Sequence, residues 1–149
     1  MFFEIGSVKF IFYKFDIFLS HLIFFIQFLP KKGKVVMKKT IMLKKNYEFK
    51  KVLSKGKCFS GHYIIAFVMK NNCQNGNFLG LAISTKVGKA VRRNRIKRLV
   101  RESYYFFEEQ MHNGFSIVFL WNKHADAQNV SYADIRKDME NILKNAKVL

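Results

Sequence analysis

The chain has 149 residues, enough for one ordinary domain with its own hydrophobic core. It carries 27 Lys and Arg against 10 Asp and Glu, a formal net charge of +17, which favours a polyanionic partner: nucleic acid first, an anionic membrane surface second. Two cysteines without a CxxC motif and four scattered histidines argue against a disulfide framework and a metal site, so we expect a reducing, cytoplasmic compartment.

The first 36 residues differ in composition from the rest, with nine of the 17 phenylalanines and the single proline. Their longest uncharged run before Pro30, residues 17–29, is shorter than the roughly 20 apolar residues that span a bilayer, and the charge order of a signal peptide is missing. Three interpretations stay open: an interfacial or signal-anchor segment, an extra helix packed on the domain, and a start codon assigned too early. We favour the third, and expect a working domain of residues 37–149 without a stable membrane partner. Removing the five basic and two acidic residues of 1–36 still leaves +14.

Local patterns then predict a helix and three strands. Asn46 is a candidate cap for a helix over residues 47–55. Its apolar stripe consists of Phe49, Val52 and Leu53. Strands are predicted over residues 57–60, 63–69 and 78–84, and the turn sequence NNCQNGN between the last two predicts that the three form an antiparallel meander.

A second helix of about twenty residues, roughly 30 Å long, is predicted to begin at Ala90. The unbroken apolar run at residues 115–121 predicts a buried strand. Ser131 and Asp134 form a capping box for a last helix over residues 132–146. The order α-β-β-β-α-β-α predicts an α+β sandwich, with one four-stranded sheet and helices packed against it.

The predicted helix from Ala90 is amphipathic, with a cationic outer side. Its inner arc on a helical wheel holds Ile96, Leu99, Val100, Ser103, Phe106 and Phe107. Its outer arc holds Arg93, Asn94, Lys97, Arg98 and Arg101. Charged helix faces are usually just solvated, but like charges at i, i+4 repel by about 0.2–0.5 kcal/mol per pair. Because a bound polyanion reverses this repulsion and releases counterions, we expect the outer arc to bind nucleic acid.

Residues 85–102, TKVGKAVRRNRIKRLVRE, resemble the signature of the bacterial ribonuclease P protein subunit. The Arg-Asn-Arg core of that signature matches Arg93, Asn94 and Arg95, and basic residues follow one helical turn later. The likeness continues through LKKNYEFKKVLSKGK, residues 43–57, and covers nearly all of residues 37–149. It implies an α-β sandwich in which the third strand, the basic helix and the fourth strand form a left-handed β-α-β crossover.

The resemblance also implies a function. In that family a catalytic RNA, with Mg2+, removes the 5′ leader from precursor tRNA, and the protein assists by binding ribonuclease P RNA and the single-stranded leader. We expect the protein to be a monomer in the holoenzyme. The residues expected to bind the RNA subunit are Lys89, Arg92, Arg93, Asn94, Arg95, Lys97, Arg98 and Arg101. Those expected to bind the leader are Phe49, Leu53, Tyr63, Phe67 and Lys86.

Some residues depart from the family pattern or have a second interpretation. Leu53 stands where phenylalanine is common in the family and Ala66 where an aromatic is expected, so one platform for stacking on bases is expected to be either weaker or displaced onto Phe67. For Phe49, plain core packing is an equal alternative. No paired carboxylates or histidine beside a nucleophile point to catalytic or metal-binding residues in the protein itself. The alternative function is a ribosomal or assembly-type RNA-binding protein, which the basic helix would serve equally well.

Overall fold

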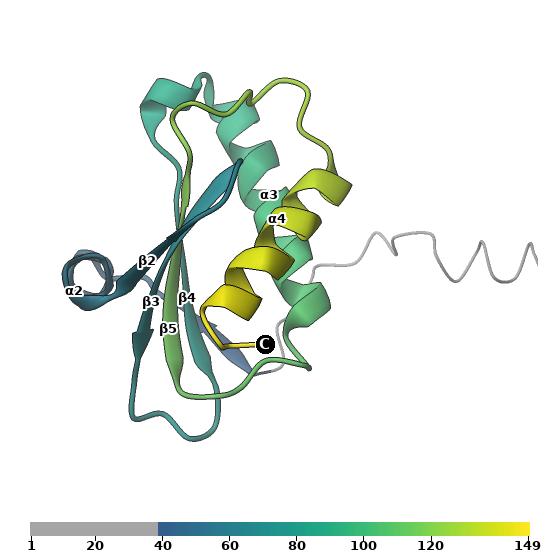
Figure 1. Cartoon of the computed structure of the whole chain (residues 1–149). Helices are drawn as coiled ribbons and strands as arrows, with labels where there is room; N and C mark the ends of the chain where they lie inside the picture. Colours follow the sequence, from purple (N-terminus) through teal and green to yellow (C-terminus); the bar gives the residue numbers. More distant parts are fainter. Residues whose placement is uncertain (1–38) are drawn as a thin grey trace, which may run out of the picture. The chain divides into compact units, whose positions relative to one another are not determined.

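The computed structural model describes residues 39–149, and the predictions made for residues 1–36 lie outside this range. The described residues belong to one compact unit, Val35–Leu149. They form one five-stranded sheet and three α-helices (Figure 1). The elements are β1 Thr40–Met42, α2 Asn46–Lys55, β2 Lys57–Ser60, β3 Ile64–Lys70, β4 Asn77–Ala82, the 3-10 helix η1 Thr85–Val87, α3 Ala90–Phe107, β5 Phe115–Trp121 and α4 Tyr132–Asn145. The predicted α+β sandwich is confirmed, with one strand more than expected.

The strand order is β1-β4-β5-β3-β2, so the predicted meander is wrong. The last strand, β5, lies between β3 and β4, antiparallel to β3 and parallel to β4. The side chain of Asn77 helps to hold β5 there, because its amide donates to the His112 carbonyl at 3.0 Å and accepts from the Phe115 N–H at 2.9 Å. The missed strand, β1, is a three-residue edge strand parallel to β4. The basic helix α3 thus connects the parallel neighbours β4 and β5.

The helices lie on both faces of the sheet: α2 on one, α3 and α4 together on the other (Figure 1). The apolar strand β3 supplies both faces because successive side chains point to opposite sides. Its residues Ile64, Ala66 and Val68 are buried in the main core. The alternate residues Ile65, Phe67 and Met69 are only half-buried. The α2 face is therefore less completely covered than the α3–α4 face.

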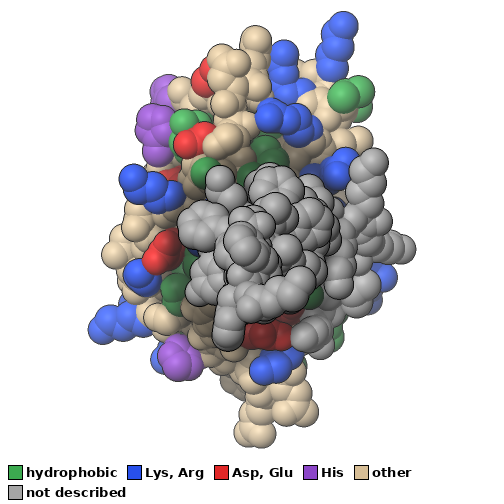
Figure 2. Space-filling model, turned by 90° about the vertical axis from the view of Figure 1, so that its right-hand side faces the viewer, with side chains coloured by type: hydrophobic (Ala, Val, Ile, Leu, Met, Phe, Trp, Pro, Cys, Tyr) green, Lys and Arg blue, Asp and Glu red, His purple; other side chains and the backbone are tan. Residues whose placement is uncertain are grey.

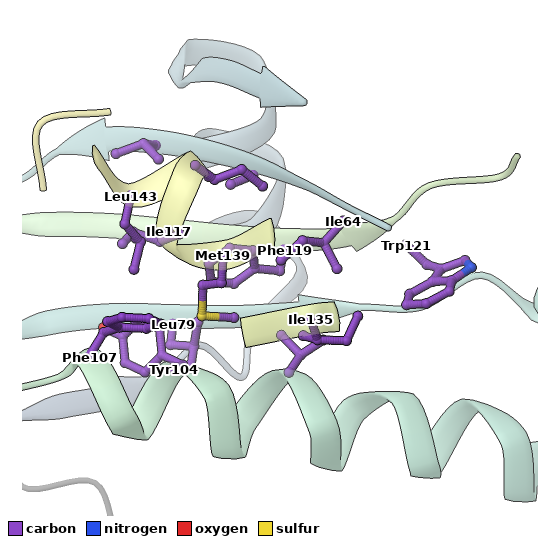
Figure 3. Packing of buried hydrophobic residues seen from close by; sticks show 14 of the residues in the cluster. Ile64, Leu79, Tyr104, Phe107, Ile117, Phe119, Trp121, Ile135, Met139 and Leu143 are labelled. Atoms are coloured by element: carbon purple, nitrogen blue, oxygen red, sulfur yellow. The ribbon is translucent and has the colours of Figure 1, made fainter. Parts of the chain in front are cut away.

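The main core lies between the sheet, α3 and α4, where Tyr104 and Phe107 approach Leu79, Met139 and their neighbours (Figure 3). Tyr104 is fully buried, and burial raises the pKa of its hydroxyl to about 12. Phe106, predicted to face inward, is 44% exposed instead, and the Arg136 guanidinium lies 4.0 Å from its ring centroid. Tyr104 occupies the inward position because it follows Val100 by four residues on the same helix face.

The two helix starts differ in how well sequence predicted them. The capping box of α4 is confirmed: Ser131 Oγ accepts from the Asp134 N–H at 3.2 Å, and Asp134 Oδ2 accepts from the Ser131 N–H at 2.9 Å. For α2 the predicted cap is wrong, because Asn46 is the first helical residue. Glu48 Oε2 instead accepts from the N–H groups of Lys44 and Lys45, at 3.1 and 3.0 Å.

The carboxylate of Asp138, on α4, holds the turn between β2 and β3. It accepts three backbone hydrogen bonds, from the N–H groups of His62 at 2.9 Å, Tyr63 at 2.8 Å and Ile64 at 2.9 Å. Asp138 is 8% exposed, and Gly61 packs so closely that a Cβ there would overlap the carboxylate. This contact ties the last helix to a turn that lies 74 to 76 residues earlier in the chain.

Within residues 39–149, no helix combines the length and apolar character needed to cross a membrane.

Candidate nucleic-acid interface

The predicted RNA-subunit residues lie on and just before α3. We call them the α3 cationic face: Lys89, Arg92, Arg93, Asn94, Arg95, Lys97, Arg98 and Arg101. Lys89, Asn94, Arg95 and Arg98 are exposed, and the others are half-buried. On the side of the molecule that carries α3 and α4, Lys and Arg side chains gather toward the top of the view (Figure 2). The helix repeat thus places Asn94, Lys97, Arg98 and Arg101 on one side of α3, whereas Arg92 and Arg95 turn toward the loop before α4.

Carboxylates neutralise little of this face. Among the residues that the structure describes, the ion pairs are Arg98–Glu102 at 4.0 Å and Lys144–Glu140 at 2.6 Å, and only the first involves the face. At 75% and 40% side-chain exposure, the Arg98–Glu102 pair adds little attraction in water. Hydrogen bonds from the Gln128 N–H and from Asn129, with a smaller contribution from the charge of Arg92, lower the pKa of nearby Asp126. The face keeps a large uncompensated positive charge.

Two arginines of the Arg-Asn-Arg core also have a structural task. Arg93 Nη1 donates to the carbonyl of Gly88, just before the helix. Arg95 Nη2 donates to the Val130 carbonyl at 2.8 Å, which fixes the end of the loop before α4. Sequence reasoning assigned both residues to RNA alone. A guanidinium has five N–H donors, so each still has donors for phosphate oxygens.

An open recess of about 710 Å³ lies between the start of α3 and the loop that precedes α4. Its lining is Gly88, Lys89, Val91, Arg92, Arg95, Ala127, Gln128 and Asn129. Three cations suit phosphate oxygens, and the two side-chain amides offer donors and acceptors of the kind that base edges use. Sequence reasoning missed the loop residues, because nothing in their local pattern indicates that they meet α3.

A second candidate surface lies beside α2. The α2-side surface, as we define it, consists of half-buried apolar residues: Phe49, Leu53, Ile65, Phe67, Met69 and Leu120. Phe49 lies against the sheet, since a Cβ on Gly80 would be 2.7 Å from Phe49 Cε1 and 3.0 Å from Val118 Cγ2. Phe49 therefore helps pack α2 onto β4 and β5, in line with the core-packing alternative. Phe67 pairs with Val118 across the β3–β5 ladder, so it shares this face of the sheet.

The structure does not bring all the predicted leader residues together. The ring of Tyr63 lies 6.1 Å from that of Trp121, centroid to centroid, and packs against the main core on the α3–α4 face. Tyr63 precedes β3 and is held by Asp138, so it leaves the strand alternation that would have placed it beside Phe67. Lys86 is exposed in η1, which packs against α3 rather than α2. Phe49, Leu53 and Phe67 are the predicted leader residues that share one side.

No group of three or more His, Cys, Asp or Glu side chains in residues 39–149 is arranged to hold a metal ion. Together, the five-stranded α+β fold, the weakly compensated cationic helix and the partly open apolar sheet face define a nucleic-acid-binding protein.

Comparisons with known proteins give the family. The model of the family described as Ribonuclease P matches residues 37–147. The chain is 39% identical over 107 residues to the ribonuclease P protein component of Clostridium botulinum strain Langeland, covering 71% of this chain and 94% of the relative. It is 41% identical over 106 residues to that of Clostridium kluyveri, covering 70% and 92%. The chain belongs to the ribonuclease P protein family.

Solved structures agree with this assignment. The RNase P protein of Staphylococcus aureus superposes with a TM-score of 0.64 at 28% identity, covering 72% of this chain and 95% of that one. The RNase P protein of Thermotoga maritima gives a TM-score of 0.64 at 29% identity, covering 70% and 96%. The alternative prediction, a ribosomal or assembly-type protein, is not favoured by these similarities.

Proposed function

We propose that this chain is the protein subunit of ribonuclease P, which assists a catalytic RNA in removing the 5′ leader of precursor tRNA. In this proposal the α3 cationic face binds the ribonuclease P RNA, and the α2-side surface binds the single-stranded leader. The observation that carries the proposal is the low carboxylate compensation of α3 in a chain of this family.

The electrostatic case for α3 depends on where its charges lie. Lys97 and Arg101 are one turn apart, so their charges repel unless an anion lies between or above them. RNA phosphates supply that anion, and each neutralised phosphate releases counterions. Planar guanidinium groups can also bind two phosphate oxygens at once, which fixes the orientation of the RNA.

The case for the α2-side surface is based on its chemistry. Leu53 on α2 and Phe67 on the adjacent strand β3 are apolar and half-buried, and α2 also carries lysines. Stacking on an aromatic ring is worth about 1–3 kcal/mol per base and tolerates any base, which suits leaders of differing sequence. Lys86 lies in η1, so it would contact the leader only where the leader passes η1. Tyr63 is better explained as a packing residue.

In this proposal the hydrolytic step belongs to the RNA subunit, and Mg2+ bound mainly by that RNA would activate water and neutralise phosphate oxygens there. The protein would contribute binding and charge neutralisation, and a monomer suffices for both surfaces. Lower Mg2+ concentrations leave more phosphate charge uncompensated, so the protein should matter most under those conditions.

The test is reconstitution of the full chain with a bacterial ribonuclease P RNA and a precursor tRNA. We expect leader removal at low Mg2+ to depend on the protein, and Arg98→Ala combined with Arg101→Ala to weaken binding of the RNA subunit. Loss of two phosphate contacts should reduce the magnitude of the log–log salt slope by about 1.4 at the single-strand coefficient.

The matched control is Lys123→Ala combined with Lys137→Ala, which removes the same charge from exposed positions outside α3. An equal loss of affinity in both double variants would mean that net charge, rather than the α3 cationic face, determines binding. Activity on a precursor without added protein at the same low Mg2+ would contradict the proposed function itself.

A further inference from the structure

A second cationic surface covers the outward side of α2, on the opposite face of the sheet from α3 (Figure 1). The exposed residues of this surface, which we call the α2 outer ridge, are Lys44, Lys45, Tyr47, Lys50, Lys51 and Lys55. The nearby acid, Glu48, accepts hydrogen bonds from the Lys44 and Lys45 backbone. Among residues 39–149, neither of the two ion pairs involves a lysine of this ridge.

Tyr47 is the aromatic member of the ridge and is 62% exposed. Its position is opposite the inward stripe of α2, so burial on the sheet does not explain it. The ammonium group of Lys45 lies 5.6 Å from the ring centroid, within cation–π range. An exposed ring bordered by ammonium groups suits an unpaired nucleotide, with the base on the ring and its phosphate beside the lysines.

The ridge and the α3 cationic face lie on opposite sides of the sheet, so one compact RNA element docked on α3 does not cover both. The ridge is instead adjacent to the α2-side surface, because α2 carries both: Phe49 and Leu53 on its inner side and Tyr47 and Lys51 on its outer side. An α-helix is about 10–12 Å in diameter, so a single strand that leaves the inner side has to cross only that width.

We propose that the α2 outer ridge binds the part of a long 5′ leader that lies upstream of the nucleotides held by the α2-side surface. Tyr47 stacks on an unpaired base, and the lysines neutralise the adjoining phosphates. This inference rests on the proposed function and extends it to leader length. Lysine is a flexible point charge, so the ridge should read backbone charge rather than sequence.

The experiment uses the reconstituted holoenzyme and two precursors of the same tRNA, with leaders of about 5 and about 15 nucleotides, a span suggested by single-strand site sizes. Tyr47→Ala should weaken binding of the long-leader precursor about tenfold and leave the short-leader precursor unchanged. Tyr47→Phe should keep full affinity, because it keeps the ring. Tyr47→Leu should behave like Tyr47→Ala, because it keeps apolar bulk without a stacking surface.

A charge variant gives a second readout. Lys50→Glu combined with Lys51→Glu should reduce the magnitude of the salt slope for the long leader by at least about 1.4, with Lys123→Glu combined with Lys137→Glu as the matched control. Equal effects on both leaders, or none on the long one, would overturn the inference. Weaker binding of the isolated RNA subunit by Tyr47→Ala would also overturn it, by assigning the ridge to that RNA.

Failure of the proposed function has a different signature. Phe67→Ala should weaken both precursors, because both leaders reach the α2-side surface. If Phe67→Ala changes neither, the leader site itself is misplaced. If Phe67→Ala weakens both while Tyr47→Ala weakens neither, the proposed function stands and the extension to the α2 outer ridge is wrong.

Discussion

Asp138 allows a quantitative test of how the fold is held together. Asp138→Ala removes the acceptor of three backbone N–H groups at a site that is 8% exposed. Each buried donor left without a partner costs about 1–3 kcal/mol. Water that enters the vacated site can bind some of the three N–H groups, so the net cost is smaller than the sum of three such penalties. We expect the free energy of unfolding to fall by about 3–5 kcal/mol, a large fraction of the 5–15 kcal/mol typical of a domain.

The Asp138→Asn variant should give an intermediate loss of stability. An amide oxygen can replace Oδ2, which accepts from Tyr63 and Ile64, but the amide NH2 then faces the His62 N–H, donor against donor. The expected loss is about 2 kcal/mol, between the wild-type protein and Asp138→Ala. Urea unfolding followed by circular dichroism measures all three, provided that the m-values agree.

Gly61 supplies the coupled variant for a double-mutant cycle. In the wild-type background, Gly61→Ala places a Cβ against the Asp138 carboxylate, so we expect a loss of about 1–3 kcal/mol from overpacking. In the Asp138→Ala background the overlapping atoms are gone, and Gly61→Ala should cost much less. Additive losses, or an Asp138→Ala variant within about 0.5 kcal/mol of wild type, would refute the reasoning.

Three further predictions concern α2, α3 and α4. Gly80→Ala should lower the free energy of unfolding by about 1–3 kcal/mol, because the added Cβ would lie 2.7 Å from the Phe49 ring. Urea titration measures this loss, which should be smaller in a Phe49→Ala background. Arg95→Ala should speed amide exchange in the loop before α4, since it removes the hydrogen bond to the Val130 carbonyl, and unchanged exchange would contradict that bond. The Ser131 hydroxyl lowers the pKa of Asp134 below its ordinary value. The stability that this carboxylate contributes is therefore present above the pKa of an unfolded aspartate, about 3.9, and is lost as pH falls through the lowered pKa, and Asp134→Asn should flatten that part of an acid-unfolding curve.

The predictions from sequence succeeded where one segment carries its own signal. The capping box at Ser131 and Asp134 needs only neighbouring residues, and the cationic arc of α3 needs only the helical repeat. The predicted strand order was wrong because the turn signal at Asn75 and Gly76 indicates that the chain turns, but not which strand becomes the neighbour of β3. That choice depends on β5, which lies about forty residues further along the chain.

The site was predictable to a similar extent. Sequence placed the basic residues on one face, but the carbonyl partners of Arg93 and Arg95 lie in segments that only the tertiary structure brings near. Tyr63 was grouped with Phe67 through the family resemblance and a strand predicted over residues 63–69, but β3 begins at Ile64 and Tyr63 packs toward the other face. The sequence could not predict that Ile65 and Met69 are half-exposed, because an all-apolar strand does not reveal that a short helix covers only part of one sheet face.

The central place of β5 in the sheet has a consequence for how the protein is made. Its partners β3 and β4 each lack a neighbour on one side until residues 115–121 arrive, and the Asp138 contact arrives later still. A nascent chain emerging from the ribosome therefore exposes two unpaired strand edges from the completion of β4 until β5 has emerged, a state that favours aggregation. Chains truncated before β5 should for this reason depend on chaperones far more than the complete protein does.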